Sequence, residues 1–313
     1  MQIRNLGQSG LRVSTIGLGC NNFGGRIDFE ATRAVIHKAI DLGITLFDTS
    51  DTYGERGGSE IDMGKALGDR RKDIVLATKF GNPMDTAGVK QGGARRYIMT
   101  AVEDSLRRLR TDWIDLYQIH SFDPLTPIEE TLRTLDDLVR QGKVRYIGCS
   151  NFPAWRVTEA HWTARLHGLN KFVSCQDEYS LVFRTPEAEV MPAARAAGMG
   201  MLPYFPLASG LLTGKYRRNA PMPPGTRLAA TQRLADRYLT ERNWVIAEKL
   251  GDFVEQRGKT MLELAFSWLL SQAPVASVIA GATRPEQLEQ NVTAGTWTLT
   301  AEELAEIDRI TAG

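Results

Sequence analysis

Residues 97–120, YIMTAVEDSLRRLRTDWIDLYQIH, hold the pattern that decides the fold. Apolar residues from Ile98 to Leu109 recur at three- and four-residue spacing, which is typical of one face of a helix. Leu116–Ile119 is a short run of mainly apolar residues, typical of a buried strand, and His120 follows it directly. The segment therefore predicts a helix and a strand, with an ionisable side chain where the strand ends.

The same alternation of helix and strand repeats along almost the whole chain. The predicted strands are Ser14–Leu18, Ile44–Phe47, Ile74–Thr78, Leu116–Ile119, Tyr146–Cys149, Phe172–Cys175, Gly200–Pro203 and Ser277–Ala280. Strands that are apolar on both faces and separated by helices predict a parallel sheet covered by helices. Eight such units predict an α/β protein with a closed (β/α)8 TIM barrel. The alternative, a doubly wound open sheet, would carry a glycine fingerprint whose spacing "GLGCNNFGG" does not match.

Two segments fall outside this repeat. The opening IRNLGQSGLRVS predicts a β-hairpin that turns at Gln8–Gly10 and caps the floor of the barrel. The segment from Phe205 to about Glu241 contains PMPPGTR and predicts a long functional loop, because irregular segments of this length are uncommon in compact domains. We expect residues 1–313 to form a single domain.

Composition excludes several classes of function. The formal net charge of +1 gives no global field for nucleic acid or an anionic membrane, and no apolar run is long enough to span a bilayer. The N-terminus lacks the apolar core of a signal peptide. The cysteines Cys20, Cys149 and Cys175 lie too far apart for a metal site or a disulfide framework, so we expect reduced thiols, no metal and a cytoplasmic location.

Polar or ionisable residues close the predicted strands. They are Asp48, Lys79, His120, Ser150 with Asn151, Gln176, Tyr204, and Gly281 with Thr283. In a parallel barrel these positions meet at one rim, where active sites of this architecture lie. Each has a structural alternative when taken alone: Asp48 as a helix cap, Lys79 as a surface lysine, His120 as a core histidine, Tyr53 as a loop aromatic. Together they favour a site.

An aspartate, a tyrosine, a lysine and a histidine suit acid–base chemistry on an oxygen atom. A lysine ammonium stabilises a tyrosine phenolate, which lowers the pKa of the phenol, and an aspartate keeps a buried lysine charged. Here Tyr53 is the expected proton donor and His120 the group that polarises a carbonyl. The alternative from another class is a lyase that uses Lys79 as an imine, as in aldolases.

The chain resembles the aldo-keto reductase superfamily over nearly its whole length. The matching motifs are FDTSDTYG, ATKFG, YQIHSFD, RYIGCSNF, VSCQDEYSL, PYFPLASGLLTGKY and VIAGATRPEQLEQNV, and they resemble the bacterial and potassium-channel β-subunit branches. The resemblance implies a barrel with the catalytic tetrad Asp48, Tyr53, Lys79 and His120. It also implies a nicotinamide cofactor bound in an extended form across the rim.

Carried over by position, the resemblance predicts the cofactor site. The carboxamide would contact Ser150, Asn151 and Gln176, the ring would stack on Tyr204, the pyrophosphate loop would contain Leu207, Gly210, Lys215 and Arg227, and the adenosine end would contact Gly281, Thr283, Arg284, Gln287, Gln290 and Asn291. Arg284 favours NADPH, with NADH as the alternative, because Gly281 and Ala282 replace a lysine and a serine that many members carry. Phe205 likewise replaces a serine. Thr283 also fits an N-cap of the next helix.

The sequence thus predicts an NADPH-dependent oxidoreductase that reduces an aldehyde or ketone reversibly, with Tyr53 as general acid and a small carbonyl compound as its partner. The alternative is a cofactor-loaded sensor or regulatory subunit with little turnover. Phe23, Phe122 and Trp155 are expected walls of the substrate pocket, each with core packing as the competing interpretation. The sequence predicts neither the physiological substrate nor the oligomeric state.

Overall fold

A computed structural model describes residues 1–312. Its strands are β1 Ile3–Asn5, β2 Arg12–Ser14, β3 Ile16–Gly19, β4 Leu46–Asp48, β5 Val75–Phe80, β6 Ile114–Ile119, β7 Val144–Ser150, β8 Ser174–Gln176, β9 Gly200–Met201 and β10 Val278–Gly281. Its longer helices are α1 Phe29–Asp41, α2 Tyr53–Leu67, α3 Arg95–Leu109, α4 Ile128–Arg140, α5 Ala154–Leu166, α9 Glu241–Glu255, α10 Met261–Ser271, α11 Pro285–Ala294 and α12 Ala301–Thr311. The shorter ones are η1 Gly68–Asp73, η2 Thr185–Glu187, α6 Val190–Ala196, η3 Ala208–Thr213, α7 Arg227–Ala230 and α8 Gln232–Tyr238.

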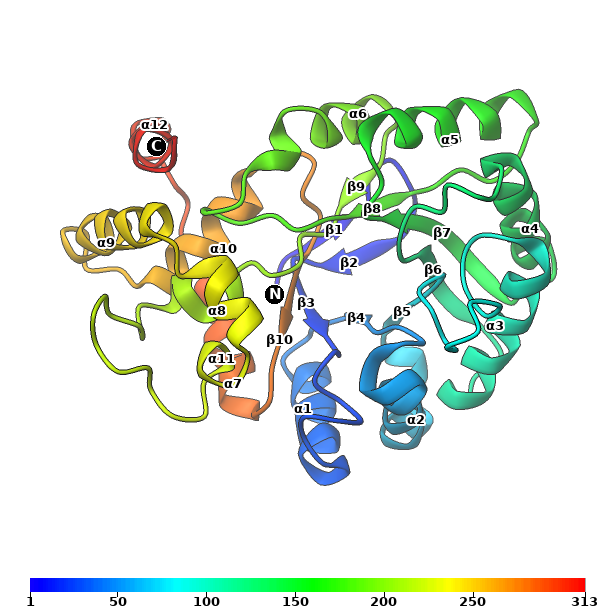
Figure 1. Cartoon of the computed structure of the whole chain (residues 1–313), viewed down its shortest axis with the longest axis horizontal. Helices are drawn as coiled ribbons and strands as arrows, with labels where there is room; N and C mark the ends of the chain where they lie inside the picture. Colours follow the sequence, from blue (N-terminus) through cyan, green and yellow to red (C-terminus); the bar gives the residue numbers. More distant parts are fainter. Residues whose placement is uncertain (313) are drawn as a thin grey trace.

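Eight strands form one parallel sheet in the order β10-β3-β4-β5-β6-β7-β8-β9. Backbone hydrogen bonds join its two ends, from Ala276 N–H to the Met201 carbonyl and from Ile279 N–H to the Pro203 carbonyl, each 3.0 Å long. The helices surround the strands (Figure 1). The predicted (β/α)8 barrel is therefore confirmed.

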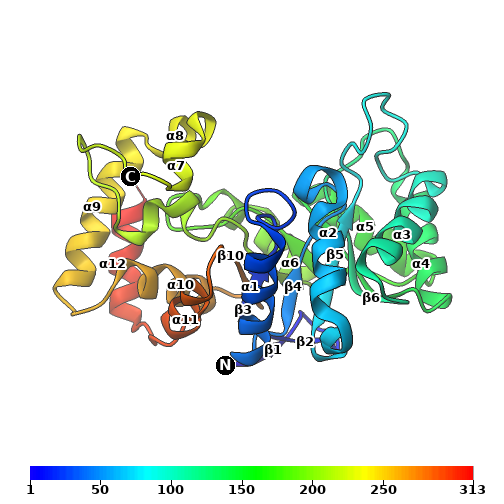
Figure 2. The ribbon, with the colours of Figure 1, turned by 90° about the horizontal axis from the view of Figure 1, so that it is seen from below.

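The N-terminal hairpin closes one end of this barrel. β1 and β2 pair antiparallel, and Leu6 and Val13 pack with apolar residues that point into the barrel, such as Leu46 and Leu116. Figure 2 shows the hairpin at the lower edge and α7 and α8 at the upper edge, so the two ends of the barrel carry different elements. The predicted hairpin cap is confirmed.

Above this apolar plug the barrel interior becomes polar. The side chain of Gln118 accepts a hydrogen bond of 3.2 Å from Ser174 Oγ and donates one of 3.3 Å to Asp48. Gly148 makes room for this layer, because a Cβ there would lie 2.2 Å from Ser174 Oγ. The polar layer carries the residues at the strand ends.

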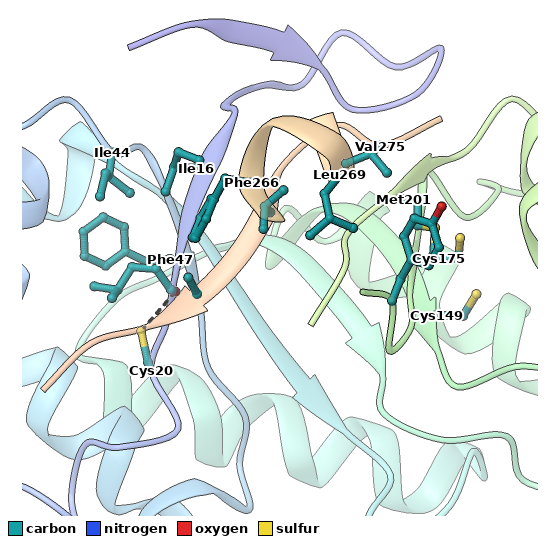
Figure 3. Packing of buried hydrophobic residues seen from close by; sticks show 14 of the residues in the cluster. Ile16, Cys20, Ile44, Phe47, Cys149, Cys175, Met201, Phe266, Leu269 and Val275 are labelled. Atoms are coloured by element: carbon teal, nitrogen blue, oxygen red, sulfur yellow. Dashed lines mark hydrogen bonds between the residues drawn. The ribbon is translucent and has the colours of Figure 1, made fainter. Parts of the chain in front are cut away.

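The outer faces of the strands pack on the helices. Figure 3 shows part of this layer, in which Ile16 of β3, Phe47 of β4, and Phe266 and Leu269 of α10 belong to one buried apolar cluster. Each of these side chains is no more than 2% exposed. Burial of this kind contributes roughly 1.5–3 kcal/mol for each large apolar side chain and holds the strand ends in fixed register.

The observed elements follow the predicted ones closely, with two differences. β5 runs to Phe80, so Lys79 lies inside the strand rather than at its end, and β9 is only two residues long, Gly200–Met201. The segment predicted as a long loop holds η3, α7 and α8. No helix among residues 1–312 is both long and apolar enough to cross a membrane.

Candidate active site

The carboxyl ends of the strands open into a cavity of about 940 Å³. Its wall contains Asp48, Tyr53, His120, Ser150, Asn151, Gln176, Tyr204, Leu207, Gly210, Lys215, Arg227, Gly281, Thr283, Arg284, Gln287, Gln290 and Asn291. Lys79 is completely buried behind this wall. The structure thus brings the predicted catalytic and cofactor-binding positions to one cavity, with Lys79 just beneath its floor.

A buried ion pair lies at the base of the cavity. Lys79 Nζ donates to Asp48 Oδ2 at 2.6 Å and to the Thr49 carbonyl at 3.0 Å. The other carboxylate oxygen, Oδ1, accepts from the Gln176 amide at 2.9 Å and from Gln118. Both charges are therefore paired and hydrogen-bonded, as buried charges must be.

Tyr53 lies over this pair at the first position of α2. Lys79 Nζ lies 5.1 Å from the centroid of the Tyr53 ring, and the rings of Tyr53 and His120 meet edge to face with centroids 5.7 Å apart. Close packing of the loop after β3 on the first turns of α2 fixes this start of the helix, because a Cβ on Gly24 would lie 2.2 Å from the backbone of Gly58. The glycine-rich segment after β3 therefore positions Tyr53.

Electrostatics set the protonation states of these groups. Burial raises the pKa of Tyr53, and the Lys79 charge acts in the opposite direction without reversing the shift. This corrects the expectation of a lowered pKa: desolvation of the phenolate outweighs the ammonium. Burial lowers the pKa of Lys79, but Asp48 and Tyr53 outweigh it and the net shift is upward. Tyr53 therefore carries its proton, and Lys79 its charge, at neutral pH.

His120 is neutral in this setting. Burial, with the Lys79 charge, lowers the pKa of its imidazole to about 3. Its Nδ1 lies 3.0 Å from Ser50 Oγ. Since His120 also lines the cavity, Nε2 is the nitrogen left for a ligand atom.

Four side chains form a linked wall beside the tetrad. Ser150 Oγ donates to the Gln176 carbonyl at 2.7 Å, and the Asn151 amide donates to Ser150 Oγ and to the His120 carbonyl. Tyr204 donates to Asn151 Oδ1 at 2.8 Å. Their donors are thus engaged with each other or with Asp48 and the His120 carbonyl, and the wall offers mainly oxygen acceptors, which suit the NH₂ group of a carboxamide.

The segment from β9 to α7, together with Arg284 at the start of α11, forms the cationic side of the cavity. Lys215, Arg227 and Arg284 line it, and within residues 1–312 none of the three forms an ion pair. Burial and the nearby charge of Arg26 lower the pKa of Arg227. A Cβ on Gly210 would lie 2.9 Å from Lys215 Nζ, so glycine keeps room for that ammonium. Unpaired cations on a cavity wall fit a polyphosphate ligand.

The last part of the cavity lies at the start of α11. Arg284 is the N-cap residue and makes no side-chain cap, so the helix N-terminus remains open to an anion. The backbone N–H and hydroxyl of Thr283 both donate to Gln287 Oε1, at 2.7 and 3.2 Å. The predicted N-cap at Thr283 is therefore wrong by one residue. Gly281 packs against Asn21 and Asn22, which a Cβ would approach within 3.2 Å.

Several site residues were missed by sequence reasoning. Asn21, Asn22 and Arg26 line the cavity from the loop after β3, and Gln118 supports Asp48 from inside the barrel. The first strand end was not treated like the others, although it leads into the same rim. Strand alternation from Leu116 to His120 would have placed Gln118 on the inner face.

The expected substrate walls lie elsewhere. Phe23 is fully buried in the apolar core rather than on the cavity wall. The rings of Phe122 and Trp155 meet edge to face at 5.5 Å, and the Arg156 guanidinium lies 4.7 Å from the Phe122 centroid. This aromatic cluster lies outside the cavity lining. Packing is therefore the better interpretation of Phe23.

Comparison with known proteins adds independent findings. The model of the aldo/keto reductase family matches residues 15–312. A similar protein is the L-glyceraldehyde 3-phosphate reductase of Escherichia coli O157:H7, which is 36% identical over 322 residues, 99% of this chain and 92% of that protein.

Two further relatives are not named as L-glyceraldehyde 3-phosphate reductases. The uncharacterized oxidoreductase YrpG of Bacillus subtilis (strain 168) is 38% identical over 94% of this chain and 91% of its own length. A probable voltage-gated potassium channel subunit beta of Arabidopsis thaliana is 36% identical over the same shares. Both branches that the motifs resemble are thus found among the relatives.

Proposed function

The chain belongs to the aldo/keto reductase family, and from this premise we propose that it reduces an aldehyde or ketone to an alcohol with NADPH. Tyr53 is the proton donor, and the reaction is reversible. A relative named as a reductase of L-glyceraldehyde 3-phosphate supports a small aldehyde as substrate.

The observation that carries the proposal is the buried Lys79–Asp48 pair beneath Tyr53 and His120, which line one cavity. An isolated buried charge pair is costly, and a hydrophobic pair of the same size would pack as well. Here the ammonium lies where it stabilises negative charge on the Tyr53 oxygen. That charge appears when Tyr53 gives up its proton.

The residues of the chain account for the proton transfer. The carbonyl oxygen accepts hydrogen bonds from Tyr53 and from His120 Nε2–H, which polarise the carbonyl. The proton then moves from the Tyr53 hydroxyl to that oxygen, and Lys79 stabilises the phenolate left behind. The raised pKa of Tyr53 keeps the proton in place until charge develops on the substrate.

The cavity fits a nicotinamide dinucleotide, which when bound supplies the hydride. The acceptor oxygens of Ser150, Asn151 and Gln176 would hold the carboxamide, and Tyr204 offers its ring face. Lys215 and Arg227 would face the pyrophosphate, and Arg284 at the open end of α11 would face a 2′-phosphate. Arg284 therefore supports NADPH over NADH.

Two alternatives have less support. For a lyase, Lys79 would have to be neutral and accessible, but it is fully buried and bonded to Asp48 and Thr49. The relatives named as channel subunits favour a sensor subunit, but the presence of all four tetrad residues favours an enzyme that turns over substrate. Borohydride trapping tests the first alternative, since labelling of Lys79 would be required.

The experiment that tests the proposal has two parts. Quenching of tyrosine and tryptophan fluorescence by NADPH and NADH gives the affinity for each cofactor. Loss of NADPH absorbance with a panel of aldehydes and ketones, triose phosphates included, gives the activity. We expect tight NADPH binding and turnover of at least one small aldehyde; NADPH binding with no turnover across the panel would support the sensor alternative instead.

A further inference from the structure

A chain of hydrogen bonds runs from His120 into the protein. Ser50 Oγ lies 3.0 Å from His120 Nδ1 and 3.2 Å from Asp51 Oδ1. The Tyr97 hydroxyl of α3 donates to the other carboxyl oxygen, Asp51 Oδ2, at 3.1 Å. Ser50 and Asp51 are both buried, Asp51 with 1% exposed. His120 thus has a polar support that the reaction described above does not use.

The number of protons shared by His120, Ser50 and Asp51 limits the directions in which their hydrogen bonds can run. Ser50 has one hydroxyl proton, and besides Asp51 and His120 its oxygen meets only the N–H and hydroxyl of Thr52, which can both donate to it. Since His120 is neutral, its ring has one N–H, on Nδ1 or on Nε2. The direction of the Ser50 hydroxyl therefore decides which nitrogen carries the proton.

Asp51 can hold or release a proton near neutral pH. The groups around it are Glu60 of α2, Tyr97 and Arg108 of α3, Tyr117 of β6, and Lys79 of β5, whose carbonyl accepts the Asp51 N–H. Burial, followed by the Glu60 charge, raises the pKa of Asp51 to about 7, while Tyr97, Ser50 and Arg108 oppose the shift. Arg108 is engaged with Glu60 at 2.6 Å, so it does not neutralise Asp51.

We propose that Ser50 and Asp51 are positioning residues that set the tautomer of His120 and thereby select a carbonyl or an alcohol at the site. The inference deepens the proposed reductase function and rests on it for its chemical consequence. Neither residue touches the substrate; both act through the imidazole.

Two hydrogen-bond patterns follow from the geometry. When Asp51 is protonated, it donates to Ser50, Ser50 donates to His120 Nδ1, and the imidazole proton lies on Nε2, where it binds a carbonyl oxygen. When Asp51 is ionised, it accepts a hydrogen bond from the Ser50 hydroxyl, Ser50 accepts from Nδ1–H, and Nε2 becomes an acceptor for an alcohol hydroxyl. In each pattern the hydroxyls of Ser50 and Tyr97 each have an acceptor, and so does the proton that Asp51 or His120 Nδ1 carries.

The test reads the tautomer directly. Nitrogen-15 NMR of the histidine rings separates N–H from bare nitrogens, and the chain has only four histidines, so a His120→Gln spectrum assigns the signal. We expect the His120 proton to move from Nε2 to Nδ1 between about pH 6 and about pH 8.5, in the free and the NADP⁺-bound protein. A tautomer that stays the same over this range, or a doubly protonated ring at its lower end, overturns the proposal.

Asp51→Asn is the matched variant. Tyr97 donates to the oxygen at the Oδ2 position, so the amide NH₂ of the new residue faces Ser50 and imitates protonated Asp51. We expect Nε2–H at every pH in this variant. Ser50→Ala is the second variant: it breaks the chain, and the His120 tautomer should no longer change with pH. A wild-type switch in either variant overturns the proposal.

Kinetics give the second readout. As pH rises through about 7, the wild-type protein should lose the hydrogen bond from His120 Nε2–H to the carbonyl oxygen. Its KM for a carbonyl substrate should therefore rise about tenfold, while the KM of Asp51→Asn should change less than about twofold. The same rise in both proteins overturns the proposed selection. If no carbonyl is reduced but the NMR switch occurs, the proposed reductase function fails while the control of the His120 tautomer stands.

Discussion

The two sides of the cavity differ in whether their charged side chains are paired within the protein. At the ends of β4 and β5, Asp48 and Lys79 satisfy each other within the protein, with Gln118 and Gln176 completing the hydrogen bonds. Around η3, α7 and α11, the cations that line the cavity have no acidic partner among residues 1–312. The first side thus holds its charges in pairs, as the proposed chemistry requires, and the second leaves cations available to an anionic ligand. Mutations should separate turnover from binding along this line.

The largest effect is expected from Tyr53→Phe. Removing the hydroxyl removes the proposed proton donor, and general acid catalysis contributes about 10²–10⁴-fold to a rate. We expect kcat to fall by that factor while the NADPH dissociation constant stays unchanged. Steady-state kinetics and fluorescence titration measure the two quantities.

Tyr204→Phe is the matched control on the cofactor side. It removes the hydrogen bond to Asn151 but leaves the ring face, so NADPH binding should weaken slightly and kcat should fall far less. Similar losses of kcat in the two variants would break the comparison between the two sides.

Lys79→Met tests the internal pairing. It leaves the Asp48 carboxylate buried with only the two glutamine amides as partners, which should lower the free energy of unfolding by about 3–5 kcal/mol. The double variant Lys79→Met with Asp48→Asn removes the uncompensated charge and should recover most of the loss. Urea denaturation of the three proteins measures this, and equal stability of the single and double variants would show that the pair is not coupled.

Arg284→Ala and Arg227→Ala sharpen the assignment on the cofactor side. Losing a charge-assisted hydrogen bond of roughly 1.5 kcal/mol should weaken NADPH about tenfold in Arg284→Ala, with little effect on NADH. Arg227 faces the part that both cofactors share, so its loss should weaken them equally. Fluorescence titration distinguishes these patterns. If Arg284→Ala weakened the binding of NADPH and NADH equally, Arg284 would not be the residue that recognises the 2′-phosphate.

The smallest effect concerns Asp177, a buried carboxyl next to Gln176 that has no lysine partner. Its Oδ2 makes no hydrogen bond within the described chain, and burial raises its pKa to about 7. Because the folded state then holds this proton more tightly than the unfolded state, stability is lost as pH rises from about 4 to about 7.

Asp177→Asn removes this loss. We expect the variant to be more stable than the wild type by about 1–2 kcal/mol at about pH 8, with no difference near pH 4. Thermal unfolding at the two values measures the change. Asp48→Asn at the same pH should destabilise the protein, since Asp48 is paired; stabilisation by both substitutions would contradict the contrast.

Much of the fold could be predicted because its signals are local. Each strand carries its own apolar run, and Asp28 caps α1 through the backbone N–H of Ala31, three residues away. The (β/α)8 repeat then fixes where strand ends meet, so the positions of Asp48, Lys79 and His120 along the chain were enough to group them.

The remainder depends on contacts between distant segments. The direction of the Tyr53 pKa shift depends on how deeply the phenol is desolvated, which no spacing reveals. The approach of Gly24 to Gly58 needs the loop after β3 placed against α2, and the Ser50–Asp51–Tyr97 chain needs α3 placed beside the end of β4. Side-chain polarity at the rim and the pairing of Lys79 with Asp48 could be predicted from the amino-acid sequence; the other hydrogen-bond partners could not.

A crystal structure of the complex with NADP⁺ tests the central claim most directly. The account predicts the nicotinamide ring against Tyr204, next to the Tyr53 hydroxyl and His120, with the pyrophosphate beside Lys215 and Arg227 and the 2′-phosphate at Arg284. A dinucleotide bound away from Tyr53, or a Tyr53 hydroxyl turned away from both Lys79 and His120, would contradict it.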